Sequence, residues 1–365
     1  MAYHIRIIDK NKERDAFRRL FQTVFHHQMT AKLWEWKYLE NPMTLDQPLI
    51  YIAEHEGEIV GARPILPNRM KFGDNILKVA QPCDTMVHPE HRRKGIFAKM
   101  TNFAIIDAQK RGFSLFYGFP NLLLGKIYKN VKSLGWEVIS KIDASYKIFS
   151  PSKVISTTMP ENILSSIGKI FFRFLSSKKC KLPSLKPAKS YDINVESTIA
   201  NEIENLWQGL SVNYKISTVR DEKYVKWRFI KHPENNYKFL SARKSKELLG
   251  YFVFNIVKND KLIEGRIVDY GIKENSKDVF LALLLEALNN FKNDECNLVS
   301  TWAFTQPQFQ QVLDRCGFIR KLSFPYKIFT ETSYFVANKI VSNNLPIYPM
   351  DKKHWYITQS DTDTY

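Results

Sequence analysis

The sequence predicts an α/β protein built from two tandem domains, each a mixed, twisted sheet flanked by helices. Three observations lead to this fold class. The chain has 365 residues, which suits about two domains at roughly 150 residues per domain. An ordered internal repeat covers both halves of the chain. In each half, segments with strand character alternate with segments that have helical spacing.

The internal repeat consists of short segments that recur in the same order. In the first pair, Trp36 and Pro42 of residues 33–42 match Trp227 and Pro233, 191 positions further along the chain (36 to 227). Three more pairs follow in register: 50–62 with 237–251, 79–87 with 264–272 (aligning Asp84 with Asp269), and 134–136 with 316–318. Several matches in one order favour two copies of a single α/β unit over chance similarity.

The elements of the first copy follow from apolar spacing and turn residues. Helical spacing predicts helices over 11–27 and 31–39, and alternation predicts strands over 49–54, 58–66, 70–72 and 77–87. A basic turn then leads into a helix over 95–111, which Gly112 ends as a C-cap. A strand over 114–119, a helix over 123–134 and a strand over 137–149 complete the copy.

These elements predict the domain boundaries. The first domain is expected over 1–150, a connector over 151–189, a degenerate second domain over 190–330 and a C-terminal tail over 331–365. Within the connector, residues 163–175 form a basic amphipathic stretch. Packing against the protein's own domains is the expected role of this stretch, and binding at a membrane surface is the alternative.

Composition and charge limit the class of protein. The chain is 44% hydrophobic and carries a net charge of +17, with 54 Lys and Arg against 37 Asp and Glu. This excess favours polyanionic partners, but the basic residues are dispersed and no nucleic-acid-binding motif is present, so nucleic acid is disfavoured. The sequence has neither a membrane span nor a signal peptide, which predicts a cytoplasmic protein. Four separated cysteines predict reduced thiols and no metal.

The residues that carry chemistry gather where the strand over 77–87 meets the helix over 95–111. The sequence from 83 to 98 reads CDTMVHPEHRRKGIFA. Arg92, Arg93 and Lys94 stand at the helix N-terminus, where free backbone N–H groups and the helix dipole favour a phosphate. Gly95 has no Cβ to hold a phosphate away. The pattern predicts a diphosphate site, and it matches neither GxxxxGK[ST] nor GxGxxG.

At these residues the sequence resembles the GNAT superfamily of N-acetyltransferases. The family signature, Arg/Gln-x-x-Gly-x-Gly/Ala, reads here Arg92-x-x-Gly95-x-Phe97, with Phe97 in place of a small residue. The resemblance spans 3–149 and looks closest to the duplicated proteins of the enhanced-intracellular-survival type. In the second copy, KENSKD over 273–278 replaces the signature. The resemblance therefore implies two tandem GNAT-like domains, of which the first binds acetyl-CoA and the second is non-catalytic.

The resemblance also implies roles for particular residues. Acetyl-CoA would lay its pyrophosphate on the backbone amides of 93–98 and its pantetheine arm along the preceding strand. The family's tyrosine acid falls at Val131, so Tyr128 on the same helical face is the substitute candidate, with plain packing as the alternative. Asp84 is the candidate base, although the matching Asp269 keeps a structural role open. The residues expected to bind the cofactor are Met86, Val87, Arg92, Arg93, Lys94, Gly95, Ile96, Phe97, Ala98 and Asn121.

These inferences predict an N-acetyltransferase that moves acetyl from acetyl-CoA to a primary amine by direct attack. Its partners would be acetyl-CoA and a small amine-bearing acceptor, and a homo-oligomer is the default oligomeric state. His88 and His91 show no third ligand, so no metal is expected there. The tryptophans Trp34 and Trp36 are expected to pack in the core or between domains. Two alternatives stay open: an aminoacyl-tRNA-dependent aminoacyl transferase of the tandem-GNAT type, and a non-enzymatic acyl-CoA-binding protein.

Overall fold

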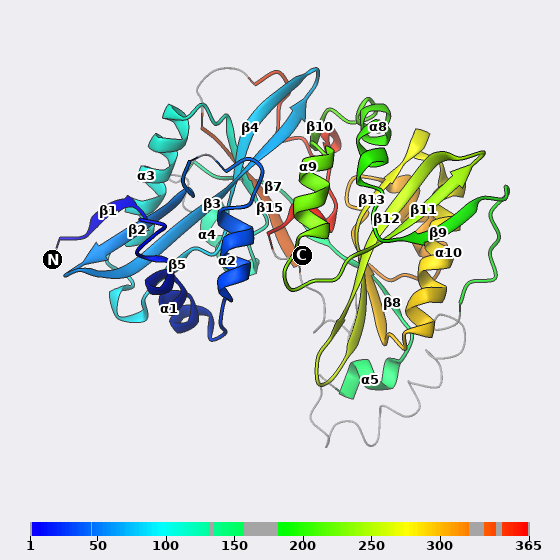
Figure 1. Cartoon of the computed structure of the whole chain (residues 1–365), viewed down its shortest axis with the longest axis horizontal. Helices are drawn as coiled ribbons and strands as arrows, with labels where there is room; N and C mark the ends of the chain where they lie inside the picture. Colours follow the sequence, from blue (N-terminus) through cyan, green and yellow to red (C-terminus); the bar gives the residue numbers. More distant parts are fainter. Residues whose placement is uncertain are drawn as a thin grey trace.

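The computed structural model describes residues 2–44, 46–130, 135–156, 182–320, 332–340 and 345–363. Within these residues the chain forms two mixed sheets flanked by helices, one in each half of the molecule (Figure 1). The fold class predicted from the sequence is confirmed. The C-terminal part of the chain lies between the two halves (Figure 1).

The first sheet has a central parallel pair, β4 and β6, among antiparallel neighbours. Two short strands, β5 and β10, pair with the long strand β3, and β16 pairs with β10. The remaining strands follow the order β1 (His4–Ile7), β2 (Ile50–His55), β3 (Glu58–Phe72), β4 (Asn75–Pro82), β6 (Leu115–Gly118), β15 (Thr332–Lys339) and β7 (Glu137–Asp143); the short strands are β5 (Met86–Val87), β10 (Ile216–Thr218) and β16 (Trp355–Tyr356).

The second sheet repeats this plan with one parallel pair, β13 and β14. Its order is β8 (Ser145–Ile148), β14 (Leu298–Thr301), β13 (Ile263–Ile272), β12 (Glu247–Lys258), β11 (Lys238–Lys244) and β9 (Asp192–Glu196). The helices are α1 (Arg14–Phe25), α2 (Ala31–Tyr38), α3 (Ile96–Lys110), α4 (Leu122–Asn130), α5 (Pro151–Ser156), α8 (Ala200–Ser211), α9 (Glu222–Val225), α10 (Lys277–Asn293) and α11 (Pro307–Arg315). A π-helical turn, Lys226–Ile230, follows α9.

Alternating side chains on β2 assign one group of helices to each face of the first sheet. Ile50 and Ile52 pack in one buried cluster with residues of α1 and α2, whereas Tyr51 and Ala53 pack in clusters that contain residues of α3. Successive residues of a strand point to opposite faces, so this alternation places α1 and α2 on one side and α3 on the other. The face that carries α3 is the one that bears the predicted diphosphate site.

Four predicted strands differ from the structure. The strands expected over 58–66 and 70–72 are one continuous strand, β3. The strand expected over 77–87 is broken between β4 and β5, where Asp84 takes a left-handed conformation with φ 40°. The strand expected over 137–149 divides at Ala144 into β7, in the first sheet, and β8, in the second.

The two halves exchange strands. β8, from the expected first domain, pairs with β14 of the second sheet. β15, from the expected tail, lies between β6 and β7 of the first sheet. The expected C-terminal tail, to which the sequence assigned no element, therefore supplies an interior strand. Local sequence patterns could not predict which sheet β8 and β15 join, because the alternation of apolar and polar residues along a strand does not depend on its partner.

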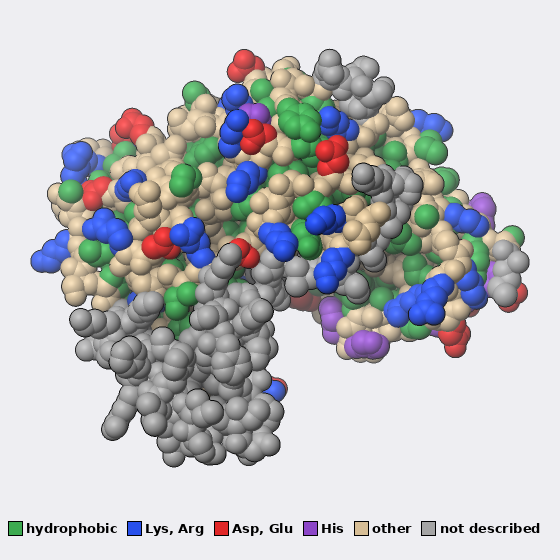
Figure 2. All heavy atoms as spheres, turned by 180° about the vertical axis from the view of Figure 1, so that it is seen from behind, with side chains coloured by type: hydrophobic (Ala, Val, Ile, Leu, Met, Phe, Trp, Pro, Cys, Tyr) green, Lys and Arg blue, Asp and Glu red, His purple; other side chains and the backbone are tan. Residues whose placement is uncertain are grey.

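The amphipathic stretch over 163–175 and Cys180 lie outside the described residues. Among the helices of the described ranges, none combines the length and the apolar character needed to cross a bilayer. On the face shown in Figure 2, Lys and Arg side chains are scattered over the described surface, with Asp and Glu among them. This distribution agrees with the dispersed charge seen in the sequence.

The two matching tryptophans of the internal repeat meet at the interface between the halves. The rings of Trp36 and Trp227 stack with their centroids 5.1 Å apart. The indole N–H of Trp36 donates to the carbonyl of Trp227 at 2.8 Å, and the indole of Trp227 returns the bond to the carbonyl of Trp36 at 2.9 Å. This reciprocal pair supports the interpretation of the two segments as equivalent copies. It also bears out the expectation of interdomain packing for Trp36.

We expect Trp36→Phe to destabilise the protein by about 1–3 kcal/mol, because the buried carbonyl of Trp227 loses its donor. Urea unfolding measures the change. Trp34→Phe is the matched control, since Trp34 is fully buried but its indole N–H has no partner among the described residues. Equal losses of stability in the two variants would show that ring volume, rather than the reciprocal hydrogen bond, holds the interface.

Candidate functional site

The helix α3 begins at the predicted diphosphate site with an uncapped N-terminus. Gly95 precedes the helix in the left-handed conformation (φ 75°, ψ 7°), and no side chain caps the first turn. Arg93 is also left-handed, with φ 63°. A Cβ added at Gly95 would meet no atom within 4 Å, so the backbone angle, rather than a lack of space, calls for glycine here.

The backbone around Gly95 offers a row of free donors. Among the described residues, none accepts a hydrogen bond from the backbone N–H groups of 93–98. Arg92, Arg93 and Lys94 are exposed beside these groups, and the Arg92 Nε donates to the Val87 carbonyl at 3.2 Å. Free N–H groups, a helix dipole and three cations make an anion site. We refer to residues 92–98 as the cradle.

The strands β4 and β6, which precede and follow the cradle and α3 in the chain, separate from one another. β4 and β6 pair only at Val79–Leu115 and Ala80–Phe116. Beyond this point the chain continues through residues 83–85 into β5, which pairs with β3 and with no other described strand. The other edge of β5, formed by Met86 and Val87, therefore has no strand partner within the described part of the chain. An extended ligand could hydrogen-bond to that edge.

Asp84 lies at the start of this open edge and is held by helix α2. The Lys37 Nζ lies 2.7 Å from the Asp84 carboxylate, and the Tyr38 hydroxyl donates to the same oxygen at 2.5 Å. Lys37 also lies 3.2 Å from the carboxylate of Asp363. Burial alone would lower the pKa of Lys37, but the two carboxylates raise it above its usual value. Burial raises the pKa of Asp363, and Lys37 opposes that rise.

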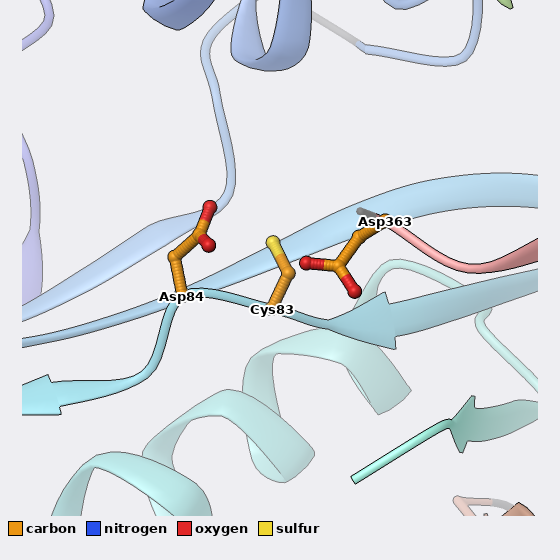
Figure 3. Close-up of side chains that lie close together, drawn as sticks. All are labelled: Cys83, Asp84 and Asp363. Atoms are coloured by element: carbon orange, nitrogen blue, oxygen red, sulfur yellow. The ribbon is translucent and has the colours of Figure 1, made fainter. Parts of the chain in front are cut away.

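The thiol of Cys83 completes this cluster. Figure 3 shows Cys83, Asp84 and Asp363 close together, and their potential ligand atoms all lie within 4.8 Å of one another. The ammonium group of Lys37 already supplies a cation to both carboxylates. Burial raises the pKa of the Cys83 thiol well above its usual value, which keeps this thiol protonated. The arrangement is therefore an ion-paired carboxylate cluster with a neutral thiol.

A partly open cavity of about 30 Å³ adjoins the cluster, between the two halves of the molecule. The first half contributes residues of α2, β3, β4 and β6, and the second half contributes residues near α9. Lys37 and Asp363 belong both to the cavity and to the carboxylate cluster. The side chains that define the cavity include Trp36, Lys37, Gln81, Tyr117, Trp227, Arg228 and Asp363.

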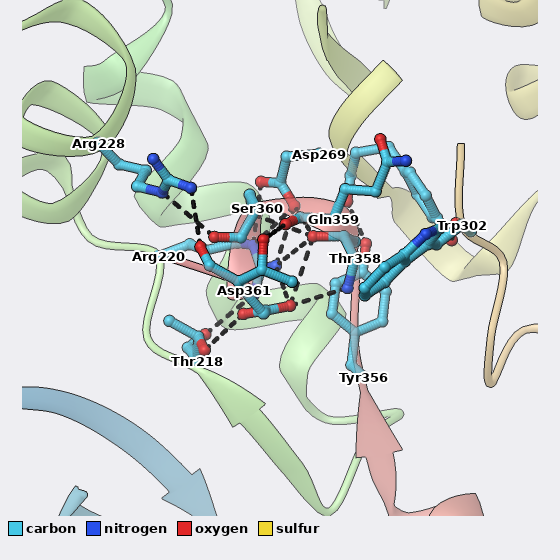
Figure 4. A network of polar contacts seen from close by, with 12 residues as sticks. Thr218, Arg220, Arg228, Asp269, Trp302, Tyr356, Thr358, Gln359, Ser360 and Asp361 are labelled. Atoms are coloured by element: carbon cyan, nitrogen blue, oxygen red, sulfur yellow. Dashed lines mark hydrogen bonds and ion pairs between the residues drawn. The ribbon is translucent and has the colours of Figure 1, made fainter. Parts of the chain in front are cut away.

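The segment 355–363, which we name the C-terminal strap, brings Asp363 to this cavity. Thr358 and Asp361 receive hydrogen bonds from the buried Arg220, which also pairs with Asp269 at 2.9 Å (Figure 4). Arg228 donates to the carbonyls of Ser360 and Thr362. Lys37 and Arg228, which match in the internal repeat, thus hold the strap from the two halves.

The second half lacks an equivalent of the cradle. Ser276 caps α10 by accepting a hydrogen bond from the Val279 N–H at 3.3 Å. The carboxylate of Asp278 stands in the first turn of α10 and accepts hydrogen bonds from the backbone of Ala188 and Lys189. A capped terminus with a carboxylate repels a phosphate, which agrees with the erased signature in the sequence.

The other predicted site residues each have their own surroundings in the structure. Tyr128 is buried and stacks on Trp136, with ring centroids 4.6 Å apart, and it is absent from the side chains around the cavity. Its role as an acid stays a prediction. Asn121, expected to bind the cofactor, accepts a hydrogen bond from the Leu124 N–H at the start of α4. His88 and His91 lie near each other, with ring centroids 5.8 Å apart.

Sequence reasoning missed Lys37 and Asp363. The repeat offered one signal for Lys37, because it aligns with the basic residue Arg228. Nothing in the sequence linked Asp363 to the site, since 326 positions separate it from Lys37. The aromatic cavity wall formed by Tyr117 was also missed. It comes from the end of β6, which sequence analysis treated only as a strand.

The whole fold is similar to solved structures of acyltransferases. A GCN5-related N-acetyltransferase from Anabaena variabilis aligns over 93% of this chain and 73% of its own, with a TM-score of 0.65 and 11% identity. A probable N-acyltransferase from Enterococcus faecalis aligns over the same shares, with a TM-score of 0.63 and 12% identity. N-myristoyltransferase from Saccharomyces cerevisiae, with bound myristoyl-CoA, aligns over 92% of this chain and 82% of its own, with a TM-score of 0.62 and 11% identity. At such identities the likeness establishes the fold.

A family model identifies the first half. Residues 4–139 match the acetyltransferase (GNAT) domain, and this segment contains the cradle, the open edge of β5 and Lys37. A search of curated proteins found no match. The match over residues 4–139 supports an acyltransferase enzyme, as the sequence predicted.

Proposed function

We propose that the protein transfers an acetyl group from acetyl-CoA to a primary amine, with the cosubstrate bound in the first half. The observation that carries this proposal is the cradle, where six consecutive backbone N–H groups lie free beside three exposed cations. The unpaired edge of β5 extends from the cradle toward Asp84. The diphosphate of CoA would suit the cradle. Its extended, amide-containing arm would suit the open edge of β5.

We place the acceptor amine in the cavity between the halves. Leu66 of β3 borders the cavity and packs in the cluster that contains residues of α1 and α2, whereas the neighbouring Ile65 packs in the cluster that contains residues of α3. The cavity and the cradle therefore lie on opposite faces of the first sheet. An amine in the cavity and a thioester arriving from the cradle would meet where β4 and β6 separate. The second half would then form one wall of the acceptor site.

The reaction joins the amine nitrogen to the thioester carbonyl carbon and breaks the carbon–sulfur bond. The ammonium proton must leave before attack, and the departing CoA thiolate must gain a proton. The carboxylates of Asp84 and Asp363, directly or through water, are the candidate acceptors for the amine proton. Lys37 keeps both carboxylates together and balances their charge. The N–H edge of β5 would polarise the carbonyl.

Two measurements test this function on the full-length protein. Isothermal titration with CoA tests the cradle, and thiol release from acetyl-CoA in the presence of a panel of amines tests the transfer. The panel should include amino sugars, polyamines, a lysine peptide and a peptide with a free N-terminus. CoA binding with amine-dependent thiol release supports the proposal. CoA binding without release for any acceptor would favour a non-enzymatic acyl-CoA-binding protein, and retention of transfer RNA without CoA binding would favour an aminoacyl transferase.

We expect Asp84→Asn to lower the rate of thioester turnover by about 10², the usual contribution of a general base. The affinity for CoA should stay unchanged, because Asp84 is held by Lys37 and Tyr38 on the α2 side of the sheet. Steady-state thiol release and calorimetry measure the two effects separately. Near-normal turnover would limit Asp84 to a structural role as a partner of Lys37.

A further inference from the structure

Arg63 on β3 is a fully buried cation close to the cradle. Its exposed fraction is 0%. Gly61, two residues earlier on the same strand face, lies against Ile96 and Met100 of α3. Side chains two residues apart on a strand share a face, so Arg63 also points toward α3. The guanidinium carbon lies 5.2 Å from the centroid of the Phe97 ring.

Most of the donors on this guanidinium have no partner. The Arg63 Nη1 donates to the Thr85 hydroxyl at 3.3 Å, but Nε and Nη2 are buried without a hydrogen-bond acceptor in the described part of the chain. No carboxylate within the described ranges forms an ion pair with Arg63. A buried, unpaired charge is strongly unfavourable in a folded protein. Such a group indicates that an acceptor from outside the chain completes the site.

The cradle is the adjoining place where an anion can bind. Phe97 contributes a backbone N–H to the cradle, while its side chain covers Arg63. The residue is only half-buried. The ring thus stands between the free amides and the unpaired guanidinium. Thr85, the other contact of Arg63, lies between Asp84 and β5, next to the open edge that leaves the cradle.

We propose that Arg63 is a buried contact for the diphosphate of the acyl-CoA cosubstrate, covered by Phe97 in the free protein. When the cosubstrate binds, the Phe97 ring turns aside and Arg63 Nε and Nη2 donate to diphosphate oxygens. This assignment rests on the proposed function and adds a residue that the cradle sequence does not contain. Arg63 then belongs to the cosubstrate site, and Phe97 sets how readily the site opens.

The test uses Arg63→Met, with CoA as the probe and with two readouts that should move in opposite directions. Removing an unpaired buried charge should raise the melting temperature of the free protein. The affinity for CoA should fall about 10- to 100-fold, the loss expected for a hydrogen bond to a charged group. Arg63→Lys should keep part of the affinity. Arg111→Met, at the far end of α3, is the control and should leave CoA affinity unchanged.

The outcomes separate this proposal from the proposed function. Absence of CoA binding by the unaltered protein would overturn both. Normal CoA affinity in Arg63→Met, with binding intact in the unaltered protein, would overturn only the role of Arg63. A fall in both melting temperature and affinity would make Arg63 a structural residue. The loss should persist with dephospho-CoA; if it vanished, Arg63 would contact the 3′-phosphate and the assignment to the diphosphate would be wrong.

Phe97→Ala provides an independent check that does not remove the guanidinium. Without the covering ring, the donors of Arg63 are open before the ligand arrives, so CoA should bind at least as tightly as to the unaltered protein. Adding Arg63→Met to this variant should abolish any gain. If Phe97→Ala weakens binding and Arg63→Met changes nothing further, the ring itself contacts the ligand and the proposed movement is wrong.

Discussion

Gly95→Glu is expected to reduce CoA affinity by at least about 10³-fold, because like charges brought together cost several kcal/mol. The substituted carboxylate would stand among the free backbone N–H groups of 93–98, where the diphosphate is proposed to bind. The residue would also be forced into the left-handed conformation that Gly95 adopts. Isothermal titration with CoA measures the loss.

Gly112→Glu is a matched control for this prediction. Gly112 follows the other end of α3 with φ 78°, and a Cβ there would also meet no atom within 4 Å. The two substitutions therefore share the backbone strain and the added charge, but only one of them lies in the cradle. Equal CoA affinities in the two variants would show that the diphosphate binds elsewhere, and the transferase mechanism would then lose its cosubstrate site.

Lys37→Met is expected to lower the free energy of unfolding at pH 7 by about 3–5 kcal/mol, as found when one partner of a buried ion pair is removed. Lys37 is 6% exposed and lies within hydrogen-bond distance of the carboxylates of Asp84 and Asp363. Without the ammonium group, two neighbouring carboxylates remain with no cation between them. Thermal and urea unfolding measure the change.

The loss in Lys37→Met should depend on pH. Burial raises the pKa of Asp363 in the folded protein, so the folded state binds this proton more tightly than the unfolded chain. The contribution of Asp363 to stability is therefore present at low pH and declines as the pH rises through the folded pKa. Lys37 opposes the rise, so its loss raises that pKa further, and the deficit of the variant should shrink as the pH falls from 7.

Lys71→Met serves as the control for the loss of a lysine. Lys71 donates to the carbonyl of Ser211 and pairs with no carboxylate among the described residues. Its removal should therefore cost less and should show little dependence on pH. If the two variants were equally stable at every pH, the carboxylate cluster would contribute nothing beyond packing, and its role in proton transfer would lose its structural basis.

Local patterns predicted the elements that depend on nearby residues. The helix expected over 95–111 is α3, and Gly112 ends it in the left-handed conformation. The hairpin over 50–62 forms β2 and the start of β3. The strand expected over 137–149 was predicted as one element, because the change of direction at Ala144 is set by partners far away in the sequence. β8 pairs with residues 298–301, and no local signal encodes that pairing.

The candidate site likewise contains parts that local sequence patterns predicted and parts that they did not. The cradle is one continuous segment, so its charges, glycine and helix start could be read together. Asp84 was predicted as the candidate base, but its ion pair with Lys37 depends on α2 packing against the break between β4 and β5. Asp363 reaches the cluster on the strap, which Arg220 and Arg228 hold by hydrogen bonds. These contacts arise from tertiary packing, which spacing along the chain does not reveal.

The placement of β15 between β6 and β7 has a consequence for biosynthesis. As the chain leaves the ribosome, residues 115–143 emerge long before residues 332–339 can bridge them. During that interval the first sheet exposes two unsatisfied strand edges, at β6 and β7, which are prone to non-native association. Completion of the first sheet therefore waits until residues 332–339 have been made, and a translation product truncated before residue 332 would lack this interior strand.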